Sequence, residues 1–221
     1  MTSGSTFPRR FTKIDPLSLP DHFYLTADDE CYFLGEYTAR KGYSFSDTNQ
    51  LILNLKKTMD RRGKMDWPYK AAAIRKAARA FQVALNVSAR TSFTFVPVPP
   101  SRAKSDPLYD DRLVQMLRGI WPGQQVDVRE LINQTASTEA SHDSQSRPTP
   151  AELISRYVLD GELLTPQPRA IAIIDDVLTT GSHFVAARTV LRHVLPDAQI
   201  VGLFVARRVP ETMDFQDLEI P

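Results

Sequence analysis

The stretch at residues 175–182 places two adjacent acids before a short turn of hydroxyl side chains and one glycine, Asp-Asp-Val-Leu-Thr-Thr-Gly-Ser. Two carboxylates at one point can accept hydrogen bonds from neutral hydroxyl groups, such as those of a ribose. The hydroxyls and backbone N–H groups of the turn can surround a phosphate where a helix begins, because the helix dipole attracts anions. This order predicts a site for a phosphorylated sugar, with Asp175 and Asp176 on its hydroxyls and Thr179, Thr180, Gly181 and Ser182 on its phosphate.

Two elements must position these residues. The β-branched run at residues 171–174 is typical of a central parallel strand, and open α/β sheets bind their ligands at the carboxyl ends of such strands. Residues 182–195 predict the helix that follows, because its apolar residues recur on one face, namely Phe184, Ala187, Val190, Leu191 and Val194. A ligand-free acid pair before a capped helix would show part of this pattern, and that alternative stays open.

The stretch also resembles the 5-phosphoribosyl-1-pyrophosphate (PRPP) loop of type I phosphoribosyltransferases. That loop has four apolar residues, two acids, two variable residues, Thr-Thr-Gly, one variable residue and Thr, and this chain differs only at the last position, where it has His183. The resemblance implies that Asp175 and Asp176 hold the ribose 2′- and 3′-hydroxyls and that residues 179–182 hold the 5′-phosphate. An imidazole can still donate to a phosphate, so His183 remains a candidate. The resemblance further implies Mg²⁺ bound mainly through PRPP.

The rest of the chain alternates strand and helix signals, which predicts an α/β fold with a parallel sheet, in keeping with the type I phosphoribosyltransferase fold. The expected elements are a strand at 93–98, a helix from Asp106-Pro107 to Gly119, a strand at 125–132, a helix from the capping box Thr149–Glu152 to Asp160-Gly161, and a strand at 199–206. We expect residues 1–90 to form a small, mainly helical accessory region with helices from Ser46 and Pro68. Residues 91–210 would form the phosphoribosyltransferase-like domain and 211–221 a tail.

The loop after the first strand carries polar and basic residues, Ser101, Arg102 and Lys104. Phosphoribosyl transfer expels pyrophosphate, which needs cations and donors opposite the 5′-phosphate. The segment Val-Pro-Val-Pro-Pro-Ser-Arg at 96–102 resembles the pyrophosphate loop of ComF-like and amidophosphoribosyltransferase-like proteins. We therefore expect Arg102 to be catalytic and Ser101 and Lys104 to bind substrate. A basic surface loop stiffened by prolines is the alternative.

The polar segment at residues 134–147 interrupts the series of strands and helices. Long loops of this kind inside a domain are often lids, and in type I phosphoribosyltransferases a mobile loop at this place closes over PRPP. His142 and Arg147 are then candidates to contact the pyrophosphate.

The acceptor and the turnover remain open. Family members that act on 6-oxopurines have an acid where this chain has Thr179, so hypoxanthine and guanine are disfavoured and orotate-like, ammonia-like or unknown acceptors remain. We expect a PRPP-dependent transferase. The other class is a non-catalytic PRPP- or nucleotide-binding module with a regulatory, nucleic-acid-associated or antiviral defence role.

Composition limits the setting and the partners. The chain has 221 residues, a net charge of +1 and a single cysteine, Cys31, which rules out an internal disulfide and a multi-thiolate zinc site. A cytoplasmic protein without a membrane span is expected, and a homo-oligomer is left open. Nine cations lie close in sequence, Lys56, Lys57, Arg61, Arg62, Lys64, Lys70, Arg75, Lys76 and Arg79. They could bind nucleic acid, but a solvated helix face is the expected reading.

Overall fold

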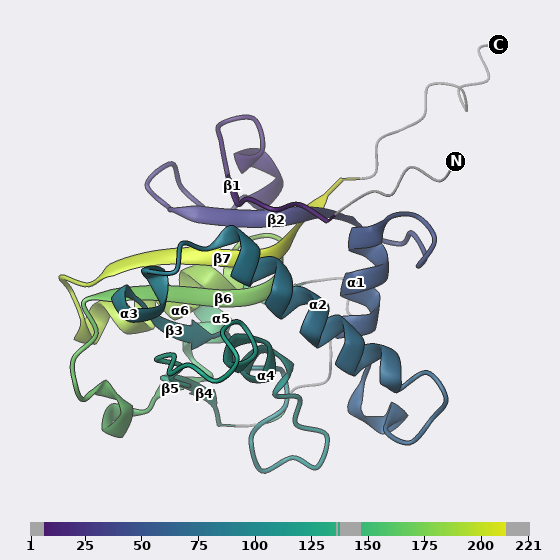
Figure 1. The fold of residues 1–221 in the computed structure, drawn as a ribbon. Coiled ribbons are helices and arrows are strands. Elements are labelled where there is room, and N and C mark those ends of the chain that lie inside the picture. Colours follow the sequence, from purple (N-terminus) through teal and green to yellow (C-terminus); the bar gives the residue numbers. More distant parts are fainter. Residues whose placement is uncertain (1–6, 136, 138–146, 211–221) are drawn as a thin grey trace.

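The computed structural model describes residues 7–135, 137 and 147–210, and Figure 1 shows a five-stranded sheet with helices on both faces. The strand order is β1-β2-β7-β6-β3, where β1 is Thr12–Lys13, β2 is Cys31–Thr38, β7 is Gln199–Val209, β6 is Ala170–Leu178 and β3 is Thr94–Pro97. All neighbouring strands are parallel except β1 and β2, which are antiparallel. The predicted α/β class with a mostly parallel sheet is confirmed.

Two hydrophobic clusters cover the two faces of this sheet. One contains the buried faces of α1 (Asp47–Leu55), α2 (Pro68–Ala84) and α4 (Arg112–Arg118), and the other contains those of α5 (Pro150–Ile154) and α6 (Ser182–Val194). Smaller elements are α3 (Ala89–Ser92), the 3-10 helices η1 (Leu19–His22), η2 (Met59–Arg61) and η3 (Gly161–Leu164), and an antiparallel pair of strands, β4 (Ile132–Gln134) and β5 (Tyr157–Leu159). None of the helices within the described ranges is long and apolar enough to cross a membrane.

Strand β6 is apolar on both sides because helices cover both faces. Ala172 and Ile174 pack in the cluster of α1, α2 and α4, whereas Ile171 and Ile173 pack in the cluster of α6. The predicted strand is confirmed, but it runs on to Leu178, so both acids belong to the strand itself.

The helix after the acid pair is confirmed as α6. Phe184, Ala187 and Leu191 are buried against the sheet, while Val190 and Val194 are partly buried at its margin. The helix starts immediately after Gly181, so its N-terminus lies beside the carboxyl end of β6.

The first ninety residues share the sheet and the core with the rest of the chain. Strand β2 pairs with β7 along its length, and α1 begins where the Ser46 hydroxyl accepts a hydrogen bond from the Asn49 N–H at 3.0 Å. Both predicted N-terminal helices are confirmed. Their buried residues form one packing surface, Leu51, Ile52 and Leu55 from α1 and Ile74, Ala77, Ala78 and Phe81 from α2.

Two expected boundaries are wrong. The helix predicted from Asp106-Pro107 begins only at Arg112. The Asp106 carboxylate does accept the Leu108 N–H at 2.8 Å, but it closes a single turn, and Asp110 then pairs with Lys70 and Arg112. The end of this helix at Gly119 is confirmed. The capping box of Thr149 and Glu152 is also confirmed, but that helix ends at Ile154, and the residues that follow pair with β4 as β5.

The strand expected at 125–132 is largely wrong as well. Its only ladder contact within the described residues upstream of β4 is a bridge from Val128 to Phe95 of β3. Regular pairing starts at Ile132, where β4 turns away to meet β5.

Candidate functional site

A pocket of about 750 Å³ opens at the carboxyl ends of β6 and β3. Nine of the sequence-predicted site residues line it, namely Ser101, Arg102, Lys104, Arg147, Asp175, Asp176, Thr179, Ser182 and His183. Thr180 and Gly181 are buried behind the wall of the pocket, and His142 lies outside the described residues. The structure thus brings together one pocket from segments that are far apart in the sequence.

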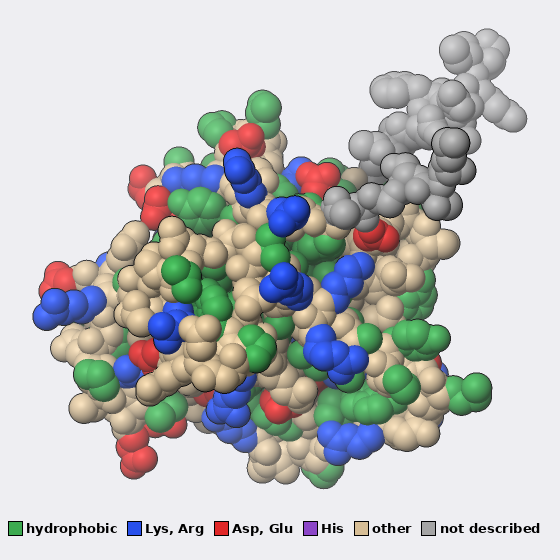
Figure 2. Space-filling view, in the orientation of Figure 1, with side chains coloured by type: hydrophobic (Ala, Val, Ile, Leu, Met, Phe, Trp, Pro, Cys, Tyr) green, Lys and Arg blue, Asp and Glu red, His purple; other side chains and the backbone are tan. Residues whose placement is uncertain are grey.

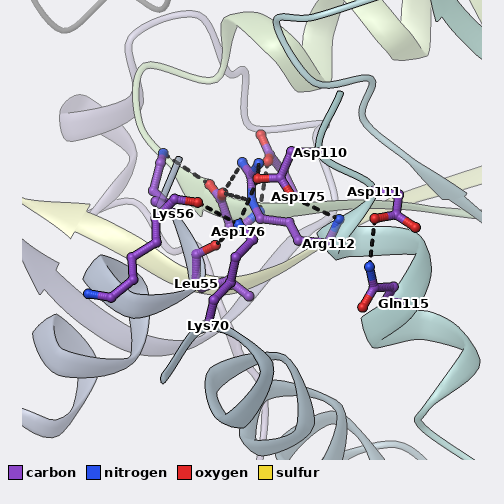
Figure 3. Close-up of polar contacts among 10 residues, drawn as sticks. Leu55, Lys56, Lys70, Asp110, Asp111, Arg112, Gln115, Asp175 and Asp176 are labelled. Carbon is purple, nitrogen blue, oxygen red and sulfur yellow. Dashed lines mark hydrogen bonds and ion pairs between the residues drawn. The ribbon is translucent and has the colours of Figure 1, made fainter. Parts of the chain in front are cut away.

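Asp176 is the more buried acid, with its side chain 3% exposed, and two cations hold it (Figure 3). Lys56 donates to Oδ1 at 3.2 Å, and Arg112 donates to Oδ2 through Nη2 at 2.5 Å and Nε at 3.0 Å. Burial alone would raise the pKa of Asp176, but the charges of Lys56 and Arg112 outweigh it and lower that pKa below the usual range. Asp176 is therefore ionised, and its two oxygens already have partners.

Arg112 continues this cluster into the helical layer. Its Nη1 donates to Asp110 at 2.8 Å, and the same carboxylate accepts from the Lys70 ammonium at 2.7 Å. The Lys70 Nζ also donates to two carbonyl oxygens at the end of α1, those of Leu55 at 2.8 Å and Lys57 at 2.7 Å. Burial lowers the pKa of Lys70 despite the opposing charge of Asp110. This alternating chain of charges fixes α1, α2 and α4 against β6.

Asp175 differs from its neighbour in exposure and in partners. It is partly exposed on the pocket wall, and its Oδ1 accepts the N–H of Asp176 at 2.7 Å. Burial and the adjacent charge of Asp176 raise the pKa of Asp175 above its usual range. A hydroxyl donor or a cation in the pocket would stabilise this carboxylate.

The turn between β6 and α6 is supported from behind by the segment after η1. Gly181 has φ +88°, and a Cβ there would lie 2.8 Å from the Leu25 side chain. The Tyr24 N–H donates to the Thr180 carbonyl at 3.0 Å, and the buried His22 donates from Nδ1 to the Thr179 carbonyl. Burial lowers the pKa of His22. These contacts fix the backbone that leads into the N-terminus of α6.

His183 lies on the first turn of α6, where the resembled motif has threonine. Its Nδ1 is 2.8 Å from the hydroxyl of Tyr157, and burial together with the charge of Lys56 lowers the pKa of His183 to about 4. The imidazole is therefore neutral at neutral pH. Burial raises the pKa of Tyr157, so its hydroxyl keeps the proton and can donate to Nδ1, which leaves the ring proton on Nε2 as a neutral donor.

The loop after β3 brings cations to the other side of the pocket, each with an acidic neighbour. Arg102 donates to Asp106 at 3.3 Å, and Lys104 lies 3.3 Å from Glu130. Tyr109 also donates to that glutamate, at 2.7 Å. The predicted basic loop is thus part of the pocket, and carboxylates hold its side chains in place.

Arg147 lines the pocket near α6. Burial and the charge of Arg208 lower the pKa of Arg147, and Arg147 in turn contributes to the lowered pKa of His183. Arg147 is therefore close to His183 on the first turn of α6, and its contact with the pyrophosphate stays a prediction.

Sequence reasoning missed Lys56, Arg112 and Lys70 as site residues. Lys56 and Lys70 belong to the basic run for which a solvated helix face is expected, but both donate to partners inside the molecule. Lys57 also points inward and donates to the Tyr43 hydroxyl at 3.0 Å. In the view of Figure 2, Lys and Arg side chains over the helical face are separated by apolar and other side chains. The sequence did carry a signal for the buried Lys70, since a lysine on the apolar face of a helix usually has a partner there.

The comparisons with known proteins add no assignment. No family model matches the chain, and the search of curated proteins finds no match. Among the described residues, no group of three or more His, Cys, Asp or Glu side chains is placed to hold a metal ion.

Proposed function

We propose that this chain has the type I phosphoribosyltransferase fold and transfers a phosphoribosyl group from PRPP to an acceptor, with release of pyrophosphate. One observation carries the proposal. Residues of the acid pair of β6, of the turn at the start of α6 and of the loop after β3 all line the same pocket, namely Asp175, Asp176, Thr179, Ser182, Ser101, Arg102 and Lys104. This is the set of groups that a ribose with phosphates at both ends requires.

Each group has a role that follows from its contacts. Asp175 accepts hydrogen bonds from ribose hydroxyls, since it is the acid that faces the pocket. Backbone N–H groups at the N-terminus of α6, the Ser182 hydroxyl and the neutral His183 bind the 5′-phosphate. Arg102 and Lys104 stabilise the pyrophosphate as it leaves, exchanging part of their contact with Asp106 and Glu130 for the more highly charged ligand.

Magnesium fits this site through the substrate. Mg²⁺ keeps several waters and binds substrate phosphates, so a single protein carboxylate is sufficient. Asp175 would hold it, because this acid lines the pocket and its carboxylate is not engaged by Lys56 or Arg112. The ion would neutralise charge on the departing pyrophosphate.

The test is binding and turnover of PRPP with Mg²⁺. At a hundredfold excess over its dissociation constant, PRPP should stabilise the fold by about 2.7 kcal/mol, which a thermal melt detects. Asp175→Asn should weaken PRPP binding and leave the fold intact, whereas Asp197→Asn, at an exposed position away from the pocket, should change neither. Absence of any stabilisation by millimolar PRPP would contradict the proposal.

One observation favours the second function, a PRPP- or nucleotide-binding module without turnover. Both carboxylate oxygens of Asp176 are engaged by Lys56 and Arg112, so the acid pair is not free as a pair. A module of this kind would bind PRPP with the same dependence on Asp175, but pyrophosphate release would stay at the uncatalysed rate with every acceptor in an orotate, ammonia and purine panel.

A further inference from the structure

The ion pair between Lys56 and Asp176 is the most adaptable contact of the charge cluster. The Lys56 side chain is 39% exposed, compared with 16% for Arg112 and 4% for Lys70. It stands at the C-terminal end of α1 and reaches Asp176 through one hydrogen bond. Arg112 holds the buried Asp176 through two hydrogen bonds, so Lys56 can exchange this contact for another anion without leaving the carboxylate unpaired.

Lys56 also lies near the start of α6. It lines the same pocket as Ser182 and His183, and its charge is, after burial, the largest influence that lowers the pKa of His183. The ammonium therefore lies on the pocket near both Asp176 and His183. A phosphate at that N-terminus would attract it more strongly than a carboxylate that Arg112 already neutralises.

We propose that Lys56 exchanges its partner in this pocket when a phosphorylated sugar binds. Its ammonium releases Asp176 Oδ1 and binds the phosphate of the sugar instead. Its departure uncovers that oxygen for a sugar hydroxyl, while Arg112 stays on Oδ2 and keeps Asp176 ionised. The proposal rests on the proposed function, since it concerns the same pocket. It assigns the pocket to ligands that carry both a phosphate and vicinal hydroxyls, because each half of such a ligand helps the other to bind.

The exchange predicts opposite changes for two partial ligands. In Lys56→Met the phosphate loses its cation, so the dissociation constant of ribose 5-phosphate should rise about tenfold. Asp176 Oδ1 is then free without any exchange, so unphosphorylated ribose should bind about two- to fivefold more tightly than it does to the unsubstituted protein. Calorimetry for ribose 5-phosphate and ligand-observed NMR for ribose measure the two changes.

Three controls separate this inference from other causes. Lys76→Met removes one charge from an exposed position on α2, outside the pocket, and should change neither affinity. Lys56→Arg should restore ribose 5-phosphate binding. A thermal melt of Lys56→Met without ligand should stay close to that of the unsubstituted protein, because Arg112 still pairs with Asp176 through two hydrogen bonds.

The outcomes also separate this inference from the proposed function. If the unsubstituted protein binds neither PRPP nor ribose 5-phosphate, the proposed function fails and the inference fails with it. If it binds both and Lys56→Met leaves ribose 5-phosphate affinity unchanged, only the role of Lys56 is overturned. If ribose binds equally to the unsubstituted protein and to Lys56→Met, or if neither binds it detectably, the proposed exchange is contradicted.

Discussion

Two connections bound the pocket, and they are held in different ways. The turn of residues 179–182 between β6 and α6 is short, and backbone contacts from Tyr24 and His22 support it. The segment of residues 98–111 between β3 and α4 is long, and side chains such as Asp106 and Asp110 hold it by hydrogen bonds and ion pairs. The first connection is thus held at its backbone carbonyl groups by one distant segment, whereas the second is held mainly through its own side chains.

The largest effect is expected at Arg112, which joins the long segment to β6. Arg112→Met leaves Asp176 buried with only the half-exposed Lys56 as a cation, and breaking such a pair costs about 3 kcal/mol of unfolding free energy. Urea unfolding measures the loss. Adding Asp176→Asn to this variant should recover part of the lost stability. If Arg112→Met alone lowers the unfolding free energy by less than about 1 kcal/mol, the long segment does not depend on the pair of Arg112 and Asp176.

A smaller effect is expected in the short turn. Gly181→Ala should cost about 2 kcal/mol of unfolding free energy, because φ is +88° and the new Cβ would meet Leu25. Gly63→Ala is the matched control, since Gly63 has φ +83° and open space around it. Chemical unfolding of the two variants should differ by the cost of the Leu25 contact. Equal losses would mean that the turn is not held from behind.

Next comes the anchor inside the long segment. Asp106 accepts hydrogen bonds from the Leu108 N–H at 2.8 Å, from Ser137 at 2.6 Å and from Arg102 at 3.3 Å. Asp106→Ala should lower the unfolding free energy by about 1 kcal/mol and weaken PRPP binding through the displaced Arg102. Asp15→Ala, which removes an exposed carboxylate that accepts the Ser18 N–H outside the pocket, should leave PRPP binding unchanged. If both variants bind PRPP equally well, Arg102 does not contribute to the binding site.

The last effect concerns pH at His183 and not the loss of a contact. The pKa of His183 is lowered to about 4 in the folded protein, whereas in the unfolded chain it has its usual value near 6.5. Between pH 6.5 and pH 4 this residue therefore binds more protons in the unfolded chain than in the folded protein. The contribution of this residue to stability therefore falls as pH falls through that interval, and His183→Asn should flatten the decline.

The same residue should not respond between pH 6.5 and 7.5. Ribose 5-phosphate affinity in the unsubstituted protein and in His183→Asn should follow the same pH curve there, since the imidazole is already neutral. Affinity that falls with rising pH only in the unsubstituted protein would mean that His183 binds phosphate as a cation.

The sequence predicts best what is determined locally. Strand β6, helix α6 and the capping box of Thr149 follow from apolar periodicity and from side chains a few residues away, and all three are confirmed. The acid pair and the turn could be placed in one pocket because the acids lie near the carboxyl end of a predictable strand and the turn directly follows it.

What could not be predicted depends on distant partners. The delayed start of α4 reflects the turn at Asp106 and the ion pairs that Asp110 makes with Lys70 and Arg112. The inward direction of Lys56 depends on the way α1 meets β6, which no local pattern encodes. The difference between Asp175 and Asp176 has the same origin, because neighbouring residues of a strand face opposite sides and meet different elements.

The position of β7 has a consequence for the order of assembly during synthesis. Strands β2 and β6 do not pair with each other; each pairs with β7, which follows every other described strand along the chain. A nascent chain can therefore form the β1–β2 ribbon and the β3–β6 pair separately, but it can join them into one sheet only after residues 199–209 have left the ribosome. Until then both halves expose strand edges, and the pocket that draws on both remains open to chaperones and proteases.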